Sequence, residues 1–318
     1  SFPFDVKLSD VVTNCDWVVR KYDGAERAKG NYNNTWTTVP YGEMLHAGQG
    51  YIWSCSGGGF ELSAIDNANK NQIFANSART IPLQEYASEH VSNSSWNLVG
   101  NPYPCYYDVS KMDYTAPITV WDRQNNTYAA YSPVDDNYVL WPYEAFFVQK
   151  PANVSSITFE ADGRQLTYTS SASANPPTAR SQSDGSEVLR HVINLELSNG
   201  QFADRTRIVI NNEAKMEYEL ECDASKFANN DMSQLYSVSD GDKYAINERP
   251  IDNGVVKLGT NLVAGGTYTI ALKDESDLIV VLLDKNTGIE TDLALDSYTF
   301  TADADDDERF EVRLFADD

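Results

Sequence analysis

Polar and apolar residues alternate with a period of two in several short segments of this 318-residue chain. Near the C-terminus, Phe310, Val312 and Leu314 are separated by Glu311 and Arg313. Because successive side chains of a β-strand point to opposite faces of the sheet, this pattern predicts a strand with one buried face. Further short segments, rich in β-branched residues or leucine and bounded by turn formers, predict strands at residues 192–197, 205–210, 268–272 and 278–283.

No stretch of 12 or more residues shows a convincing helical period. Many short strands with frequent turns are typical of β-sandwiches and β-barrels. Two such blocks follow one another along the chain, and the length allows about 100–150 residues for each. We therefore predict an all-β fold made of two β-sandwich domains in tandem.

The composition of the chain changes near residue 170. All six tryptophans and 13 of the 19 tyrosines precede residue 164. Residues 169–186 are rich in Ser, Ala and Pro and lack apolar periodicity, which predicts a flexible or polyproline-like linker. We expect an aromatic-rich sandwich at 1–168, the linker at 169–186 and an acidic sandwich at 187–318. Residues 45–53 resemble 140–148, which indicates an internal pseudo-repeat in the first domain; the alternative is chance similarity between strands.

The formal net charge is −23, and residues 187–318 contribute 12 basic and 28 acidic residues to it. A nucleic-acid backbone or an anionic membrane surface would be repelled by this charge, so neither is an expected partner. No apolar run approaches the roughly 20 residues of a membrane-spanning helix, and we expect no membrane insertion. The negative charge instead favours solubility and cations.

Four cysteines stand at positions 15, 55, 105 and 222. No pair has the two-residue spacing of a redox motif or a zinc site. Our interpretation is that all four are free and buried as small hydrophobic residues. The cysteines therefore leave the redox compartment open.

One part of the first domain carries a family resemblance. The sequence Trp96-Asn-Leu-Val-Gly-Asn-Pro-Tyr-Pro104 is followed by Trp121-Asp122 and by the strand-like Ala145-Phe-Phe-Val148. This combination resembles a module of secreted and surface-exposed proteins of Bacteroidetes, in which a Gly-Asn-Pro-Tyr-Pro turn precedes a tryptophan-bearing hairpin and a Gln-Ala-Phe-Phe-Val strand. Glu144 stands here where glutamine is expected. The second half is similar to the β-domain that often follows this module, at residues 235–241, 245–247, 266–270, 283–288, 298–302 and 309–310.

The resemblance implies a part of a larger surface protein. Such proteins are typically exported across the outer membrane and often carry leucine-rich repeats, adhesin-like segments or enzyme domains upstream. It implies a secreted or cell-surface location and a non-catalytic structural or adhesive module. The expected partners are host or neighbouring-cell macromolecules or glycans. The matching motifs are turns and core strands, so they are specific to the architecture and weakly specific to any function.

Motifs of catalysis are missing from the sequence. There is no Gly-x-Ser-x-Gly elbow, no His-Glu-x-x-His pair and no phosphate-binding glycine loop. The three histidines, His46, His90 and His191, are far apart in the sequence. We therefore expect no enzyme and no resident cofactor.

An acidic segment between two predicted strands is a candidate calcium site. Asp303, Asp305 and Asp307 lie within six residues of which five are acidic, and calcium takes six to eight oxygen ligands. The segment lacks the glycine and terminal glutamate of an EF-hand. The alternative interpretation is a solvated loop whose charges repel one another.

An aromatic-rich segment is a candidate carbohydrate site. Trp121, Tyr128 and Trp141 fall within about twenty residues, together with two further tyrosines. Flat indole and phenol rings stack on sugar faces when a β-sandwich exposes them. The alternative is that these rings fill the core, since alternate positions of each strand must be apolar.

Overall fold

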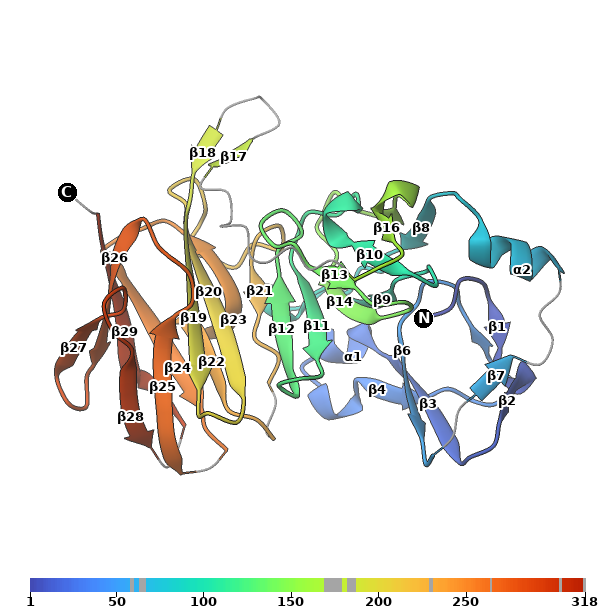
Figure 1. Cartoon of the computed structure of the whole chain (residues 1–318), viewed down its shortest axis with the longest axis horizontal. Helices are drawn as coiled ribbons and strands as arrows, with labels where there is room; N and C mark the ends of the chain where they lie inside the picture. Colours follow the sequence, from blue (N-terminus) through green and yellow to red (C-terminus); the bar gives the residue numbers. More distant parts are fainter. Residues whose placement is uncertain are drawn as a thin grey trace. The chain divides into compact units, whose positions relative to one another are not determined.

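The structure is a computed structural model that describes residues 1–57, 60–62, 67–168, 179–181, 187–228, 231–263, 265–302 and 305–316. Within these residues the fold is all-β, with two short α-helices, α1 (Gly24–Ala28) and α2 (Asn67–Phe74) (Figure 1). The prediction of an all-β fold is confirmed. The chain forms two compact units, Ser1–Ile118 with Ser132–Ala174 and Thr119–Tyr131 with Asn175–Asp318.

The division of the chain into two units differs at one hairpin from the division expected from amino-acid composition. Strands β11 (Ile118–Asp122) and β12 (Thr127–Tyr131) fall within the expected first domain, but almost all of this hairpin belongs to the second unit. The amide N–H of Ala203 donates to Asn125 Oδ1 at 2.9 Å, and the Arg205 guanidinium lies 3.9 Å from the centre of the Tyr131 ring. Amino-acid composition cannot show on which unit a hairpin packs.

Part of the expected linker is also ordered. Strand β17 (Ala179–Ser181) pairs antiparallel with β18 (Glu187–Leu189). Main-chain pairing requires no apolar side chains, so the composition of this segment did not reveal it. Residues 169–178 and 182–186 of the expected linker lie outside the described residues.

The first unit contains small antiparallel sheets (Figure 1). The three-stranded sheets are β4 (Trp36–Thr38), β3 (Trp17–Tyr22) and β6 (Tyr51–Cys55), and β13 (Val139–Leu140), β10 (Tyr106–Asp108) and β16 (Arg164–Gln165). The remaining pairs are β1 (Val6–Lys7) with β5 (Met44–Leu45), β2 (Val11–Thr13) with β7 (Phe60–Leu62), β8 (Arg79–Pro82) with β15 (Ser156–Phe159), and β9 (Trp96–Gly100) with β14 (Ala145–Gln149).

Short helices and an apolar cluster complete the first unit. The Asp23 carboxylate caps α1 by accepting the amide N–H groups of Ala25 and Glu26. Single 3-10 turns lie at Leu8–Asp10, Tyr32–Asn34, Val91–Asn93, Val109–Lys111 and Ala161–Gly163. A core near the N-terminus gathers Phe2, Phe4, Val6, Leu8, Val11, Val19, Val39 and Leu45.

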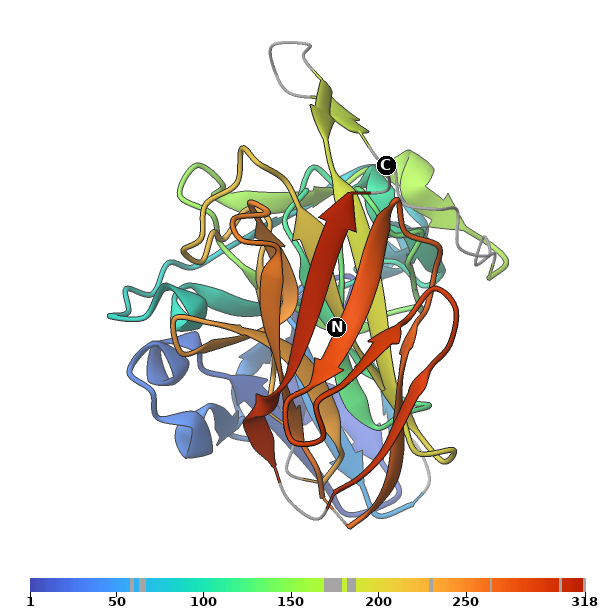
Figure 2. The ribbon, with the colours of Figure 1, turned by 90° about the vertical axis from the view of Figure 1, so that its left-hand side faces the viewer.

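The second unit is dominated by one large sheet. Its strand order is β27-β26-β29-β24-β22-β23-β20-β19-β25-β28, and β21 (Ala224–Ser225) pairs with β23. The bounds are β19 (His191–Ser198), β20 (Ala203–Ile210), β22 (Gln234–Ser239), β23 (Asp242–Arg249), β24 (Val255–Asn261), β25 (Gly266–Leu272), β26 (Leu278–Asp284), β27 (Ile289–Asp292), β28 (Tyr298–Ala302) and β29 (Asp306–Ala316). Strands β20 and β23 are parallel to each other, whereas β20 is antiparallel to β19 and β23 is antiparallel to β21 and β22. Figure 2 looks onto the C-terminal strands, drawn in orange and red, with the long strand β29 in the middle.

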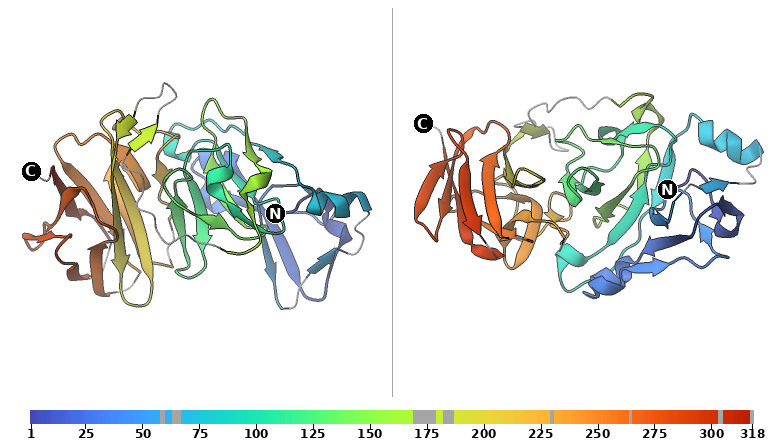
Figure 3. Two further views of the ribbon diagram at one scale, coloured as in Figure 1. Left: turned by 45° about the horizontal axis from the view of Figure 1, so that its top comes forward. Right: turned by 60° about the horizontal axis from the view of Figure 1, so that its bottom comes forward.

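The large sheet is nearly closed around an apolar core that includes Leu235, Val280 and Phe310. Strands β26 and β28 lie near opposite ends of the strand order, yet Tyr298 on β28 donates its hydroxyl proton to Asp284 on β26 at 2.7 Å. Arg309 on β29 also donates to both carboxylate oxygens of Asp284, at 3.1 and 2.7 Å. The curvature of the sheet is visible in two further views (Figure 3).

The alternation read from the sequence matches the burial of the C-terminal strands. Phe310, Val312 and Leu314 of β29 point into the core, whereas Phe315 is half exposed. Strand β26 alternates in the same way and buries Leu278 among others. The strand predictions at 278–283 and near 310–314 are confirmed.

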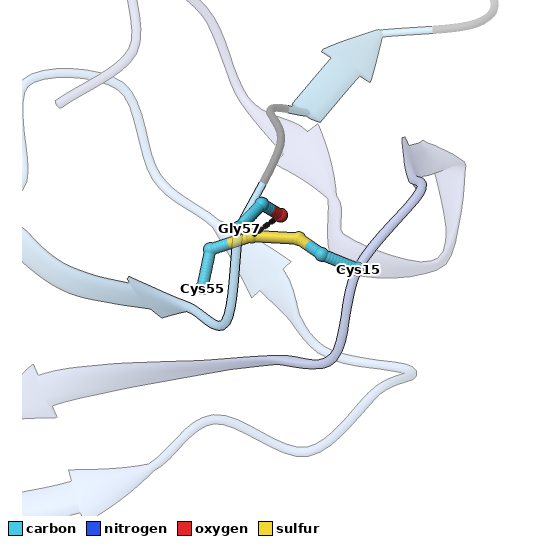
Figure 4. Close-up of a disulfide and its surroundings, with 3 residues drawn as sticks. All are labelled: Cys15, Cys55 and Gly57. Atoms are coloured by element: carbon cyan, nitrogen blue, oxygen red, sulfur yellow. Dashed lines mark hydrogen bonds between the residues drawn. A yellow bond between two sulfur atoms is a disulfide. The ribbon is translucent and has the colours of Figure 1, made fainter.

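The prediction that all four cysteines are free is wrong. Cys15 and Cys55 form a disulfide, with their Cα atoms 6.3 Å apart (Figure 4). Strands β3 and β6 pair so that Trp17 is opposite Cys55, which brings Cys15 close to its partner. Because the two cysteines are 40 residues apart in sequence, their spacing gave no signal. Cys105 and Cys222 keep their thiols.

The core predicts a contrast between two phenylalanines of β29. Phe310 is fully buried, so Phe310→Ala should lower the free energy of unfolding by about 3–5 kcal/mol through lost transfer energy and a cavity. Phe315 is 50% exposed, so Phe315→Ala should cost about 1 kcal/mol or less. Urea denaturation measures both values, and equal losses would contradict the inward–outward alternation.

The disulfide predicts a stabilisation that reductant removes. Closing a loop of 40 residues restricts the unfolded chain, so the double variant Cys15→Ala, Cys55→Ala should lose about 2–4 kcal/mol of unfolding free energy. Chemical denaturation of the wild type with and without dithiothreitol should show the same loss. A Cys105→Ala, Cys222→Ala variant is the control, and it should keep the response to reductant.

Candidate functional site

Three aromatic rings form an exposed cluster on the first unit. We call Tyr106, Trp141 and Tyr168 the Trp141 cluster. The ring centres of Trp141 and Tyr168 are 5.7 Å apart at 32°, and Tyr106 meets both rings edge-on at 5.4 and 5.5 Å. Trp141 and Tyr168 are each 46% exposed. The rings thus hold one another in place while large parts of their surfaces remain open to solvent.

A tight turn presents Trp141. The amide N–H of Glu144 donates to the Trp141 carbonyl at 3.1 Å and closes a four-residue turn. Tyr143 has a φ of +59°, a left-handed conformation that a bulky residue seldom adopts. The ring of Pro142 fixes the φ of Pro142 itself near −65°, which suits the second position of such a turn. The strained backbone therefore lies two residues after the exposed Trp141.

The Gly-Asn-Pro-Tyr-Pro turn is the anchor of this presentation. Asn101 is fully buried, and its side-chain amide donates to the carbonyls of Cys105 and Trp141 at 2.8 and 2.9 Å. Its Oδ1 accepts the amide N–H of Tyr103 at 3.0 Å. A single amide therefore joins the turn at 101–105 to the turn that carries Trp141.

Glu144 adds a second anchor at the same turn. Its Oε2 accepts the amide N–H of Trp141 at 2.8 Å, and the side chain is buried. The Glu144 carbonyl also accepts the amide N–H of Asn101 at 2.9 Å. The residue that departs from the expected glutamine thus fixes the backbone of the exposed tryptophan.

The sequence-predicted aromatic site is divided between the two units. Trp121 and Tyr128 belong to the second unit, whereas Trp141 belongs to the first. Trp121 is 40% exposed and meets Tyr128 edge-on at 4.9 Å, and Tyr128 also contacts Phe227 at 5.2 Å. The structure groups Trp141 instead with Tyr106 and Tyr168, which the sequence analysis did not select. No signal in the sequence identified Tyr106, because the neighbouring position is also tyrosine and only the structure shows that Tyr107 is the buried one.

The acidic segment has internal partners. Asp303 lies outside the described residues. The Asp305 carboxylate accepts the amide N–H of Leu262 at 2.6 Å. Asp307 accepts the Tyr236 hydroxyl at 2.5 Å and pairs with Lys243 at 2.9 Å. Among the residues with described positions, no group of three or more His, Cys, Asp or Glu side chains gathers as a metal site. The calcium hypothesis stays a prediction.

The second unit buries several ionisable groups. Arg190 pairs with Glu248 at 2.7 Å and Lys226 pairs with Asp204 at 2.6 Å, with all four side chains nearly inaccessible. Burial raises the pKa of Asp223 to about 8, although the amide N–H groups of residues 219 and 248 each donate to its carboxylate at 2.8 Å. Desolvation therefore outweighs the two hydrogen bonds that favour the ionised form.

Comparison with known proteins places the chain in a family. The family described as Domain of unknown function (DUF8693) matches residues 105–314, about two thirds of the chain. The chain belongs to this family. The part matched by DUF8693 includes the Trp141 cluster, the β11–β12 hairpin and nearly all of the second unit. No curated protein and no solved structure matches the chain.

One further property concerns membranes. Across the described ranges, no helix is both long enough and apolar enough to span a bilayer.

The Asn101 anchor predicts a stability loss. Asn101→Ala removes three hydrogen bonds and leaves the buried amide N–H of Tyr103 without its acceptor, so the free energy of unfolding should fall by about 2 kcal/mol or more. Asn34→Ala, at an exposed position of the same unit, should change it by less than about 0.5 kcal/mol. Equal effects in urea denaturation would show that the Asn101 amide is not an anchor.

The raised pKa of Asp223 predicts a pH-dependent stability. The unfolded carboxyl titrates near pH 4, so between about pH 4 and pH 8 the folded state binds more protons than the unfolded state. This group's contribution is therefore greatest below pH 4 and is lost as the pH rises towards 8, at up to about 1.4 kcal/mol per pH unit. Chemical denaturation of the wild type and of Asp223→Asn at pH 5 and pH 8 isolates the contribution of Asp223 to the free energy of unfolding. Parallel pH profiles would contradict it.

Proposed function

We propose that this chain is a non-catalytic adhesive module of a bacterial surface protein, and that it holds glycans through the Trp141 cluster. The observation that carries the proposal is the half-exposed Trp141, kept in place by Tyr106 and Tyr168 and by the buried Asn101 amide. A ring that is already fixed loses little rotamer entropy on binding. Indole and phenol faces stack on the apolar C–H faces of sugar rings.

The disulfide supports an extracellular setting. Disulfides persist in oxidising compartments, including secreted proteins and cell surfaces, and are rare in the cytosol. The Cys15–Cys55 bond therefore agrees with the location implied by the resemblance to surface proteins of Bacteroidetes. In this proposal the two compact units serve as tandem sandwich bodies that carry the glycan-binding rings within a larger protein.

The competing proposal is a purely structural spacer. Exposed aromatic residues in a spacer would bring no benefit and would favour aggregation, since contiguous apolar patches on soluble proteins commonly mark interaction sites. The exposure of Trp141 and Tyr168 therefore favours a binding role over a spacer role. The catalytic alternative has the least support. The His46–Asp5 pair is exposed to solvent, and His191 lies 3.9 Å from an exposed aspartate, Asp277.

Glycan binding predicts a selective loss on changing Trp141. The wild-type chain should be retained on a glycan array or in affinity electrophoresis with at least one polysaccharide. Trp141→Ala should weaken this retention by about tenfold or more, because the loss of one aromatic ring that stacks on a sugar costs on the order of 1–2 kcal/mol. Tyr168→Ala should weaken retention less, since it removes one side of the platform.

Trp121→Ala is the matched control, because Trp121 is an exposed tryptophan of the other unit. It should retain the wild-type affinity. Loss of retention in Trp121→Ala with full retention in Trp141→Ala would assign binding to the hairpin instead. Absence of retention on every glycan would favour the spacer.

A further inference from the structure

A polar pocket of about 520 Å³ lies on the second unit. Its volume is within the range of small-molecule sites. The pocket is formed by the turn between β22 and β23 and by the turn that follows β23, and both turns contain an aspartate with positive φ. The charged side chains of its lining are the cations Lys243, Arg249 and Lys257 and the carboxylates Asp240, Asp252, Asp307 and Glu308.

Arg249 is the unusual member of this lining. The residue is 5% exposed, and its buried Nε has no hydrogen-bond partner. Its guanidinium forms no ion pair with any carboxylate in the described part of the chain. Two other arginines of the second unit are buried and contrast with it. Arg190 donates twice to Glu248 at 3.1 and 2.7 Å, and Arg207 Nε donates to Asn194 Oδ1 at 2.8 Å.

The other cations of the pocket have partners. Lys243 pairs with Asp307 at 2.9 Å and donates to the Tyr236 hydroxyl at 2.9 Å. Lys257 lies 3.9 Å from Glu308. Burial lowers the pKa of Arg249, while the charges of Asp252 and Asp240 act in the opposite direction at longer range. The guanidinium nevertheless stays charged at neutral pH.

A buried charge without a partner destabilises a fold, so such a group is expected where a ligand completes its interactions. The planar fork of a guanidinium matches a carboxylate through two parallel hydrogen bonds. Asp240 and Asp252 accept hydrogen bonds and repel additional negative charge, which disfavours a phosphate dianion and favours a ligand with one negative charge and donors beside it.

We propose that Arg249 binds the carboxylate of a small ligand in this pocket, and that hydroxyl or ammonium donors of the same ligand face Asp240 and Asp252. Acidic sugars and amino acids share this chemistry. The site lies in the second unit, so it is separate from the Trp141 cluster and goes beyond the glycan binding proposed above.

Calorimetric titration of the full chain with D-glucuronate, L-serine and D-glucose tests the proposal. Glucuronate or serine should bind, and glucose, which lacks a carboxylate, should not. Binding of glucuronate alone would identify an acidic sugar as the ligand class, and binding of serine alone an amino acid. Arg249→Met should weaken binding by about tenfold or more, because charge-assisted hydrogen bonds are lost.

Arg313→Met is the matched control, since it removes the same charge from a surface ion pair on β29. It should bind within twofold of the wild type. Failure of both carboxylates to bind, or equal binding by Arg249→Met, would overturn the proposal.

Thermal unfolding without ligand gives an independent readout. Arg249→Met removes an uncompensated buried charge, so the midpoint should rise by about 2 °C or more. Arg190→Met should lower it, because Glu248 would lose its partner. A lower midpoint for Arg249→Met would show that this guanidinium serves the fold, and the proposal would then be wrong.

Discussion

Enclosure of one apolar core by one curved sheet is the constraint on which the second unit depends. Each fully buried side chain the size of leucine contributes about 1.5–3 kcal/mol, but only if the sheet excludes water from both ends of the strand order. The hydrogen bond from Tyr298 to Asp284 meets this requirement, because it joins β28 to β26 by side chains, and these two strands are not neighbours in the strand order. Arg309 on β29, the main-chain partner of β26, donates to the same carboxylate. The buried Asp284 carboxylate is in turn satisfied by these donors, so the seam leaves no orphaned charge.

The buried basic side chains of the second unit differ in whether a carboxylate contacts them. Arg190 and Lys226 are buried with a carboxylate in contact, an arrangement that compensates desolvation without adding much net stability. Arg249 is buried to a similar extent and receives only distant compensation. This difference in pairing, and not the abundance of acidic residues, distinguishes the pocket beside β23. The contacts of the fold do not explain why Arg249 is buried there.

The sequence revealed what is local in this fold. Alternation located β26 and β29 because the pleat imposes a period of two on each strand separately. It could not reveal that β3 and β6 bring Cys15 to Cys55, since strand register is a property of two distant segments. The Trp141 cluster could likewise be predicted only in its local part. Trp141 was selected as an aromatic residue in a turn-rich segment, but its neighbour Tyr168 is 27 residues away and its anchor Asn101 is 40 residues away.

The assignment of residues 119–131 to the second unit affects how the chain would separate after proteolytic cleavage. Because residues 119–131 belong to the second unit and residues on both sides of them belong to the first, the backbone passes between the units near 118, 131 and 174. A protease that cleaves once in the segment after residue 168 removes only the last of these three connections. The two fragments would stay joined through the hairpin, whose contacts with Ala203 and Arg205 would have to break before either fragment could diffuse away. A molecule cleaved once there would therefore remain in one piece until these contacts break.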